Sequence, residues 1–136
     1  MKWILLKTKI NEKEFEAIEN SLDVEFPIDF KNIVLENNGA SPEKMLFDTQ
    51  NTKERVAEYL LSFSKTDKDN IIDVYNYVKD RFDRKLIPII RDPFGNYICF
   101  DFSTKKLSEL YFWNHESGSL EYISKTFSEF LDSLYE

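Results

Sequence analysis

The sequence predicts an α+β fold: one domain, residues 1–136, with helices packed on a mainly antiparallel, mixed-order sheet of about five or six strands. Two patterns support this. Apolar residues recur every three or four positions in four segments, as on the buried face of a helix, and with period two in others, as in strands. The chain is 42% hydrophobic and shows no repeat or long linker, which favours a single core.

Capping residues predict the first two helices. Asn11 suits an N-cap and Glu14 follows three residues later, as in a capping box. The second helix is expected to begin at Pro27, whose φ suits a first turn, and to end at Asn38-Gly39 through a left-handed residue. The stripes expected to be buried are Phe15, Ile18 and Leu22 in the first helix and Phe30, Ile33 and Val34 in the second.

Two further helices are expected in the second half of the chain. One follows the cap candidates Asp69 and Asn70, and the last begins at Thr126, which would form a capping box with Glu129. Their buried faces are expected to hold Ile71, Val74, Tyr75, Val78 and Phe82 in the third helix and Phe127, Phe130, Leu131 and Leu134 in the fourth.

Extended runs at 86–91 and 96–102 predict a hairpin, in which Asp92-Pro93-Phe94-Gly95 forms the turn. The second strand places Ile98, Phe100 and Phe102 on one face and Tyr97, Cys99 and Asp101 on the other, so we expect it in the centre of the sheet. Residues 109–113 supply its neighbour. Shorter strands are expected near 44–48 and 56–63, and 64–70 should form an exposed loop.

The formal net charge of −7 is unevenly distributed. Residues 1–9 contain three lysines and no acid, so residues 10–136 carry 15 basic and 25 acidic side chains, a net charge of −10. No basic cluster suited to phosphates is visible, which argues against direct nucleic-acid binding. An acidic surface favours a basic partner, although it also serves solubility alone.

The single cysteine, Cys99, cannot form an internal disulfide, and no secretory segment follows Met1, so we expect a cytoplasmic protein. No apolar run is long enough to cross a bilayer, and we expect no membrane partner. With one histidine, one cysteine and no metal-binding spacing, the sequence predicts no metal site. The isolated Gly39, Gly95 and Gly118 form no glycine-rich loop for phosphate, and we expect no cofactor.

Four segments together resemble the SUKH superfamily, which includes bacterial immunity proteins and fungal cell-wall-synthesis regulators. They are IENSLDVEFPIDFKNIVLENNGA (18–40), LIPIIRDPFGNYICFD (86–101), YFWNHE (111–116) and ISKTFSEFL (123–131). Arg91-Asp92-Pro93 departs from the looser turn usual in that family, and Asn114 stands where Asp is frequent. These differences bear on local contact chemistry rather than on the fold.

The resemblance implies a protein that works by binding another protein. Bacterial members neutralise a cognate toxin, often a nuclease, in the cytoplasm, and fungal members act as regulatory hubs. The first hypothesis is therefore an immunity protein, a monomer or weak homodimer, that occludes a basic toxin. The alternative is a regulatory scaffold protein.

An enzyme is the third hypothesis, because a cysteine and a histidine can form a nucleophile and its base. Cys99 and His115 are the only residues of their kinds, and Asp101 or Glu116 could orient the imidazole. The simpler interpretation is that Cys99 is a small buried apolar residue. The sequence shows neither a glycine-rich nucleophile turn nor an oxyanion hole, so we expect no catalysis.

Two groups of residues are candidates for contact with a partner. Trp113 is a possible aromatic anchor or else a core residue, and Asn114, His115 and Glu116 follow it at a strand end. Asp48, Asp92, Asp101 and Glu116 would offer carboxylates around the sheet, although the default interpretation of each is an ordinary solvated side chain.

Overall fold

The computed structural model describes residues 1–104 and 108–136. Its main sheet has the strand order β5-β6-β7-β8-β9, and every neighbouring pair is antiparallel. The central strand is β7, as predicted. The strands are β5 (Tyr59–Leu60), β6 (Leu86–Arg91), β7 (Tyr97–Asp101), β8 (Glu109–Trp113) and β9 (Leu120–Ser124).

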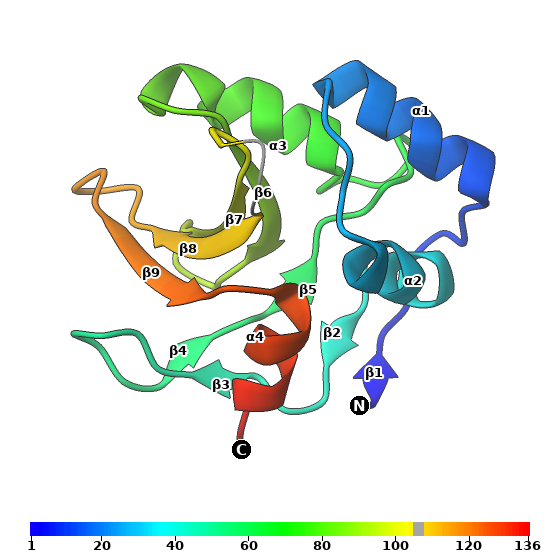
Figure 1. Cartoon of the computed structure of the whole chain (residues 1–136). Coiled ribbons are helices and arrows are strands. Elements are labelled where there is room, and N and C mark those ends of the chain that lie inside the picture. Colours follow the sequence, from blue (N-terminus) through cyan, green and yellow to red (C-terminus); the bar gives the residue numbers. More distant parts are fainter. Residues whose placement is uncertain (105–107) are drawn as a thin grey trace.

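Two short ladders and the helices complete the α+β architecture. The ladders pair β1 (Trp3–Ile4) with β2 (Ser41–Pro42) and β3 (Leu46–Phe47) with β4 (Arg55–Val56). The helices are α1 (Glu12–Leu22), α2 (Ile28–Asn37), α3 (Ile71–Val78), the 3₁₀ helix η1 (Lys79–Arg81) and α4 (Phe127–Ser133). In Figure 1 the strands β6 to β9 curve at the left, α2 and α4 lie to their right, and α3 lies above them.

The main core lies between the helices and one face of the sheet, and it is rich in phenylalanine. Phe15 of α1 stacks on Phe63 with ring centres 4.6 Å apart, and Phe30 of α2 meets Phe100 of β7 edge to face at 5.2 Å. Each such pair contributes about 0.5–1.5 kcal/mol beyond its buried area. A smaller cluster of Val78, Leu86, Cys99 and Trp113 lies on the other face of the sheet.

The first helix forms as predicted, and the second differs at its ends. The side chain of Asn11 accepts from the backbone N–H of Glu14 at 2.9 Å, and the Glu14 carboxylate accepts in return, which completes the capping box. Pro27 is the N-cap of α2, one residue outside the helix. Asn38 is extended, and the left-handed residue is Gly39, with φ +71°.

The later helices are shorter than predicted. The prediction that Phe82 lies on the face of the third helix is wrong, because α3 ends at Val78 and Phe82 is extended beyond η1. Thr126 does cap α4 through the N–H of Glu129. The second half of its capping box is missing, because the Glu129 carboxylate accepts from Lys125 instead.

Among the strands, the predicted bounds of β6 and β8 are confirmed, and the hairpin turn at 92–96 forms. The strands β1, β2 and β9 were not predicted. The prediction that 64–70 is an exposed loop is wrong in part, because Ser64 and Asn70 are buried. Asp67 holds this loop to the N-terminal segment by accepting a hydrogen bond from Thr8 at 2.7 Å.

Candidate partner-binding surface

Two turns meet at one end of the sheet and form what we call the double turn, residues 92–96 and 114–118. They are neighbours because Tyr97, which follows the first turn, pairs with Trp113, which precedes the second. The double turn thus brings together five of the seven residues proposed from the sequence. They are Asp92, Trp113, Asn114, His115 and Glu116.

Asp92 holds the first turn together. One carboxylate oxygen accepts from the backbone N–H groups of Phe94 and Asn96, both at 2.8 Å, and the other accepts from the Asn96 side chain at 2.9 Å. Gly95 supplies the positive φ of +88° that the turn requires. Because Asp92 is only 3% exposed and its oxygens are occupied, it shapes the surface from below.

Asn96 joins the first turn to the second. Its side-chain oxygen accepts the backbone N–H of His115 at 2.9 Å and lies 2.7 Å from the Nδ1 atom of that residue. An amide oxygen only accepts, so Nδ1 carries the proton in this contact. The second turn is closed by the Asn114 side chain, which accepts from the backbone of Glu116 and Ser117.

Trp113 lies beneath the double turn and is a core residue, only 2% exposed. Phe82 packs edge to face on it at 5.1 Å, and the guanidinium of Arg81 lies over its ring at 4.8 Å. Arg81 also donates to the backbone oxygen of His115, so η1 is tied to the second turn. A hollow of about 360 Å³ opens here, lined by Arg81, Phe82, Asp83, Leu86, Trp113, Gly118 and Leu120.

Phe94 is the large apolar side chain that the double turn exposes, with 71% of its surface accessible. The side chain stands on a turn whose backbone is fixed by Asp92 and Asn96. A large apolar side chain on a rigid support loses little entropy when it is buried by a partner. The exposed Glu116 and half-buried His115 supply polar groups in the second turn.

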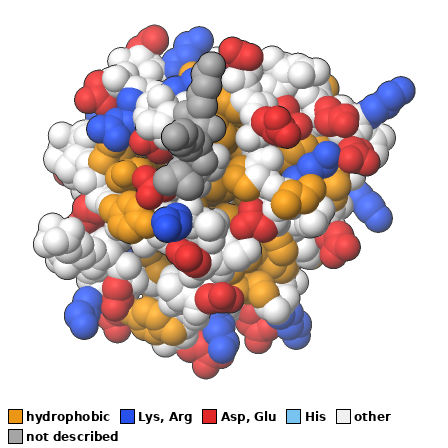
Figure 2. Space-filling model, viewed as in Figure 1, with side chains coloured by type: hydrophobic (Ala, Val, Ile, Leu, Met, Phe, Trp, Pro, Cys, Tyr) orange, Lys and Arg blue, Asp and Glu red, His pale blue; other side chains and the backbone are white. Residues whose placement is uncertain are grey.

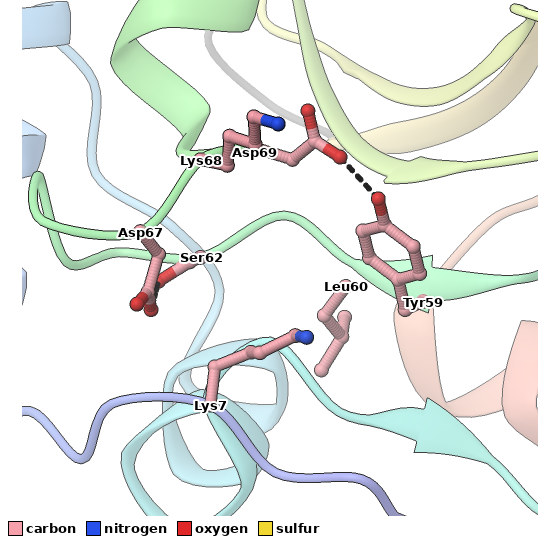
Figure 3. Close-up of a pocket in the computed structure, with 7 residues that line it drawn as sticks. All are labelled: Lys7, Tyr59, Leu60, Ser62, Asp67, Lys68 and Asp69. Carbon is pink, nitrogen blue, oxygen red and sulfur yellow. Dashed lines mark hydrogen bonds between the residues drawn. The ribbon is translucent and has the colours of Figure 1, made fainter.

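A network of charged groups continues from the double turn along the sheet edge. The guanidinium of Arg91 donates to the Tyr59 hydroxyl and to Asp69, both at 3.1 Å, and pairs with Glu58 at 3.0 Å. The Tyr59 hydroxyl in turn donates to Asp69 (Figure 3). Burial, together with this contact to Asp69, raises the pKa of Tyr59 to about 12.

Tyr59 and Asp69 also line a hollow of about 280 Å³. Figure 3 shows them with the other residues that line it, which are Lys7, Leu60, Ser62, Asp67 and Lys68. The carboxylate of Asp67 accepts from Ser62 at 2.6 Å and from Thr8 at 2.7 Å. Burial opposes ionisation of Asp67, but the hydrogen bonds from Ser62 and Thr8 outweigh it and lower its pKa. The carboxylates that line this hollow are therefore engaged inside the molecule, which gives them a structural role.

The structure does not bring Asp48 and Asp101 to the double turn. Asp101 lies at the far end of β7, is 9% exposed, and accepts from Ser103 and Arg84. Asp48 is exposed beside β3. Hydrogen bonds from Tyr135 and from the backbone of Glu54 lower the pKa of Asp48.

Cys99 and His115 do not form a catalytic pair. Cys99 is fully buried opposite Tyr111 in the middle of the sheet, and burial raises the pKa of its thiol. His115 lies beyond the end of β8, in the second turn, where its Nδ1 atom contacts the side chain of Asn96. The nucleophile and base of an acyl-transfer site would need hydrogen-bond contact.

Sequence reasoning missed three contributors to this surface: Phe94, Asn96 and Arg81. Phe94 had a visible signal, since it is the only apolar side chain in a run of turn formers apart from Pro93. Asn96 was assigned to a strand, and its link to His115 depends on sheet register. Arg81 reaches Trp113 and His115 because α3 ends at Val78 and the chain continues as the 3₁₀ helix η1.

The visible face of the molecule carries no single large charged patch. Figure 2 shows acidic and basic side chains spread over it, with apolar side chains between them. The excess of acid over base is therefore distributed on this face. Within the described residues, no group of His, Cys, Asp and Glu is arranged to hold a metal ion.

Comparison with known proteins assigns the chain to a family. The model of the family described as SUKH_6, "SMI1-KNR4 cell-wall", matches residues 12–131, which is nearly the whole chain. No curated protein matches the sequence. In the described part of the chain, every helix is too short or too polar to cross a bilayer.

Proposed function

Because the chain belongs to the SMI1-KNR4 family of the SUKH superfamily, we propose that it is an immunity protein that binds and neutralises a cognate bacterial toxin. Proteins of this family are non-catalytic immunity or regulatory proteins. The family match over residues 12–131 is the observation that carries the proposal. The immunity protein acts in the cytoplasm, where its toxin would reach its target.

The proposed mechanism is occlusion by the double turn. Phe94 is buried in the partner and acts as the anchor, while His115 and Glu116 form part of a polar rim. The hydrogen bonds of Asp92 and Asn96 support this mechanism, because a preformed turn avoids the entropy cost of ordering a loop. No bond is made or broken, so the toxin is blocked only while it is bound.

The proposed toxin is basic, and a nuclease is the leading candidate because its substrate is a polyanion. The net charge of −7 supports this choice. Opposite net charges raise the rate of encounter, and the rate falls as salt screens them. Speed matters for an antidote, since the toxin must be captured before it acts.

The experiment is co-expression with a candidate toxin, here the product of the gene beside this one. We expect cells that make both proteins to grow, and the two proteins to elute together on a sizing column. Cells that die at the same rate with and without this protein, with no complex formed, would contradict the proposal for that pair.

A pair of matched variants relates protection to the proposed surface. Phe94→Ala removes an apolar side chain that is 71% exposed, and Ile28→Ala removes one that is 67% exposed at the start of α2. We expect Phe94→Ala to lose protection and Ile28→Ala to keep it. Equal protection by both variants would mean that the toxin binds elsewhere.

A regulatory scaffold protein is the second candidate, favoured by the words "cell-wall" in the description of the matched family. Such a protein would form a stable complex with a host protein and would protect against no toxin. The co-expression experiment separates the two, because only the immunity protein changes survival.

A further inference from the structure

Asn38 is the only asparagine in the sequence that is followed by glycine. In an unfolded chain this pair is chemically labile, because the backbone nitrogen of the glycine attacks the side-chain carbonyl carbon of the asparagine. Glycine has no side chain to shield that nitrogen, and it leaves the backbone free to rotate. Asparagine is for this reason one of the thermolabile residues of proteins. Whether Asn38 reacts therefore depends on how the fold holds it.

The folded protein keeps Asn38 from this reaction. The side chain is only 3% exposed, and its Nδ2 atom donates to the Thr8 carbonyl at 2.7 Å and to the Ser62 hydroxyl at 2.9 Å. Its Oδ1 atom accepts the backbone N–H of Phe63 at 2.8 Å. The ring of the reaction closes only when the Gly39 nitrogen eclipses the Cβ of Asn38, and the extended ψ of 126° at Asn38 turns that nitrogen away.

These contacts come from three separate parts of the chain. Asn38 follows α2, Thr8 belongs to the N-terminal segment, and Ser62 follows β5. The backbone N–H of Lys7 also donates to the backbone oxygen of Asn38 at 2.9 Å. Movement of one loop therefore does not free the side chain, and we expect its protection to last until these segments separate.

The product of the reaction does not fit the place that Asn38 occupies. An aspartate carboxylate only accepts hydrogen bonds, so it would face the carbonyl oxygen of Thr8 without a donor between them. It would also face the hydroxyl oxygen of Ser62, whose proton is donated to Asp67 at 2.6 Å. A buried carboxylate that is short of donors is strongly destabilising.

The second product, isoaspartate, fits no better. It lengthens the main chain by one carbon between positions 38 and 39. Gly39 has a positive φ of 71° there, and even a Cβ on it would lie 2.4 Å from the side chain of Lys7. The backbone has no room at this point for an added carbon.

We propose that Asn38-Gly39 is a spontaneous deamidation site that the fold protects, and that a chain which unfolds and reacts there does not regain the native state. The Gly39 nitrogen bonds to Cγ of Asn38 and loses its proton, and Nδ2 leaves as ammonia. Water then opens the succinimide at one of its two carbonyl carbons, which gives aspartate or isoaspartate. Unfolding thus becomes irreversible with time. This property does not depend on which partner the protein binds.

Peptide mass spectrometry of the purified chain, incubated at pH 8 with and without guanidinium chloride, measures the reaction at each asparagine. We expect Asn38 to react in the denaturant and to stay intact in the native protein. The internal control is Asn51, which is exposed but is followed by a β-branched threonine, and it should react more slowly than Asn38 in the denaturant. Equal rates for Asn38 in the native and the unfolded protein would overturn the proposal.

Refolding tests the consequence. Samples held in guanidinium chloride at pH 8 are diluted into buffer, and circular dichroism should show the refolded fraction falling in step with the fraction of Asn38 that has reacted. A sample held at pH 5 is the control and should refold fully, because the Gly39 nitrogen must lose a proton to react. Equal loss at both pH values, or complete refolding of the reacted chains, contradicts the proposal.

A matched pair of variants installs the product directly. Asn38→Asp makes the change at the buried site, and Asn32→Asp makes it on the exposed side of α2. We expect Asn38→Asp to unfold at a much lower urea concentration than the wild type, or to be unfolded without urea, and Asn32→Asp to keep the wild-type midpoint. An Asn38→Asp variant as stable as the wild type would overturn the proposal.

Discussion

Asn96 and His115 lie 19 residues apart in sequence, yet one oxygen of the Asn96 side chain contacts both the backbone N–H and the Nδ1 atom of His115. The amide nitrogen of the same side chain donates to Asp92. A single buried asparagine therefore fixes both turns at once. The rigidity of the proposed binding surface depends on this residue.

Replacing Asn96 with alanine is expected to destabilise the protein by about 1–3 kcal/mol, because it leaves Asp92 and His115 short of buried hydrogen bonds. Urea unfolding followed by fluorescence measures the change. Asn32→Ala, on the exposed side of α2, is the control and should stay within about 0.5 kcal/mol of the wild type. Equal stability of the two variants would show that the link between the turns is weak.

The glycines of the double turn provide a matched pair. Gly95 and Gly118 both have positive φ, and alanine there costs roughly 1–2 kcal/mol from backbone strain alone. A Cβ at Gly95 would also lie 3.3 Å from the His115 ring, whereas one at Gly118 meets nothing within 4 Å. We expect Gly95→Ala to lower the thermal midpoint more than Gly118→Ala. The reverse order would contradict the placement of His115 against the first turn.

The thiol of Cys99 is expected to be unreactive in the folded protein. It is fully buried and burial raises its pKa, so little thiolate forms and reagents cannot reach it. A disulfide reagent at pH 8 should modify no cysteine in the native protein and one after unfolding in urea. Rapid modification of the native protein would reopen the hypothesis of a cysteine nucleophile.

High pH should weaken the fold through Tyr59. Its pKa is raised to about 12, whereas an unfolded tyrosine ionises near 10. The neutral hydroxyl that donates to Asp69 therefore stabilises the fold fully below pH 10, and this contribution is lost as the pH rises from 10 to 12.

Urea midpoints between pH 9 and 12 test this prediction against the Tyr59→Phe variant. That variant has no hydroxyl to ionise at this position, so its stability should fall less steeply than that of the wild type. Other tyrosines ionise in both proteins and cancel in the comparison. Parallel curves would mean that Tyr59 does not contribute.

Much of the fold was predictable because its signals are local. The cap at Asn11 and the apolar runs of β6 and β8 identify their elements without reference to the rest of the chain. Strand β9 was not predicted because it is an edge strand whose residues are mostly half-buried. Glu121 and Tyr122 therefore interrupt the alternation of apolar and polar residues that identifies a strand. The ladder of β1 and β2 has two residues a side and exists only through tertiary pairing.

The candidate site was predictable in position but not in detail. The sequence shows that 92–95 and 114–116 are polar turn ends of strands, and register then makes them neighbours. The sequence does not show whether the carboxylate of a turn residue faces solvent or accepts hydrogen bonds from its own backbone. Asp92 has turned inward, and Phe94, one position beyond a proline, has turned outward.

The most direct test of the account is the affinity of the purified protein for its toxin, measured by calorimetry for the wild type, Phe94→Ala and Ile28→Ala. If the double turn carries the binding energy, Phe94→Ala should weaken binding about tenfold or more, which is the range of an interface anchor. Ile28→Ala should bind like the wild type. A toxin that binds Phe94→Ala and the wild type equally tightly would contradict the claim that this surface blocks it.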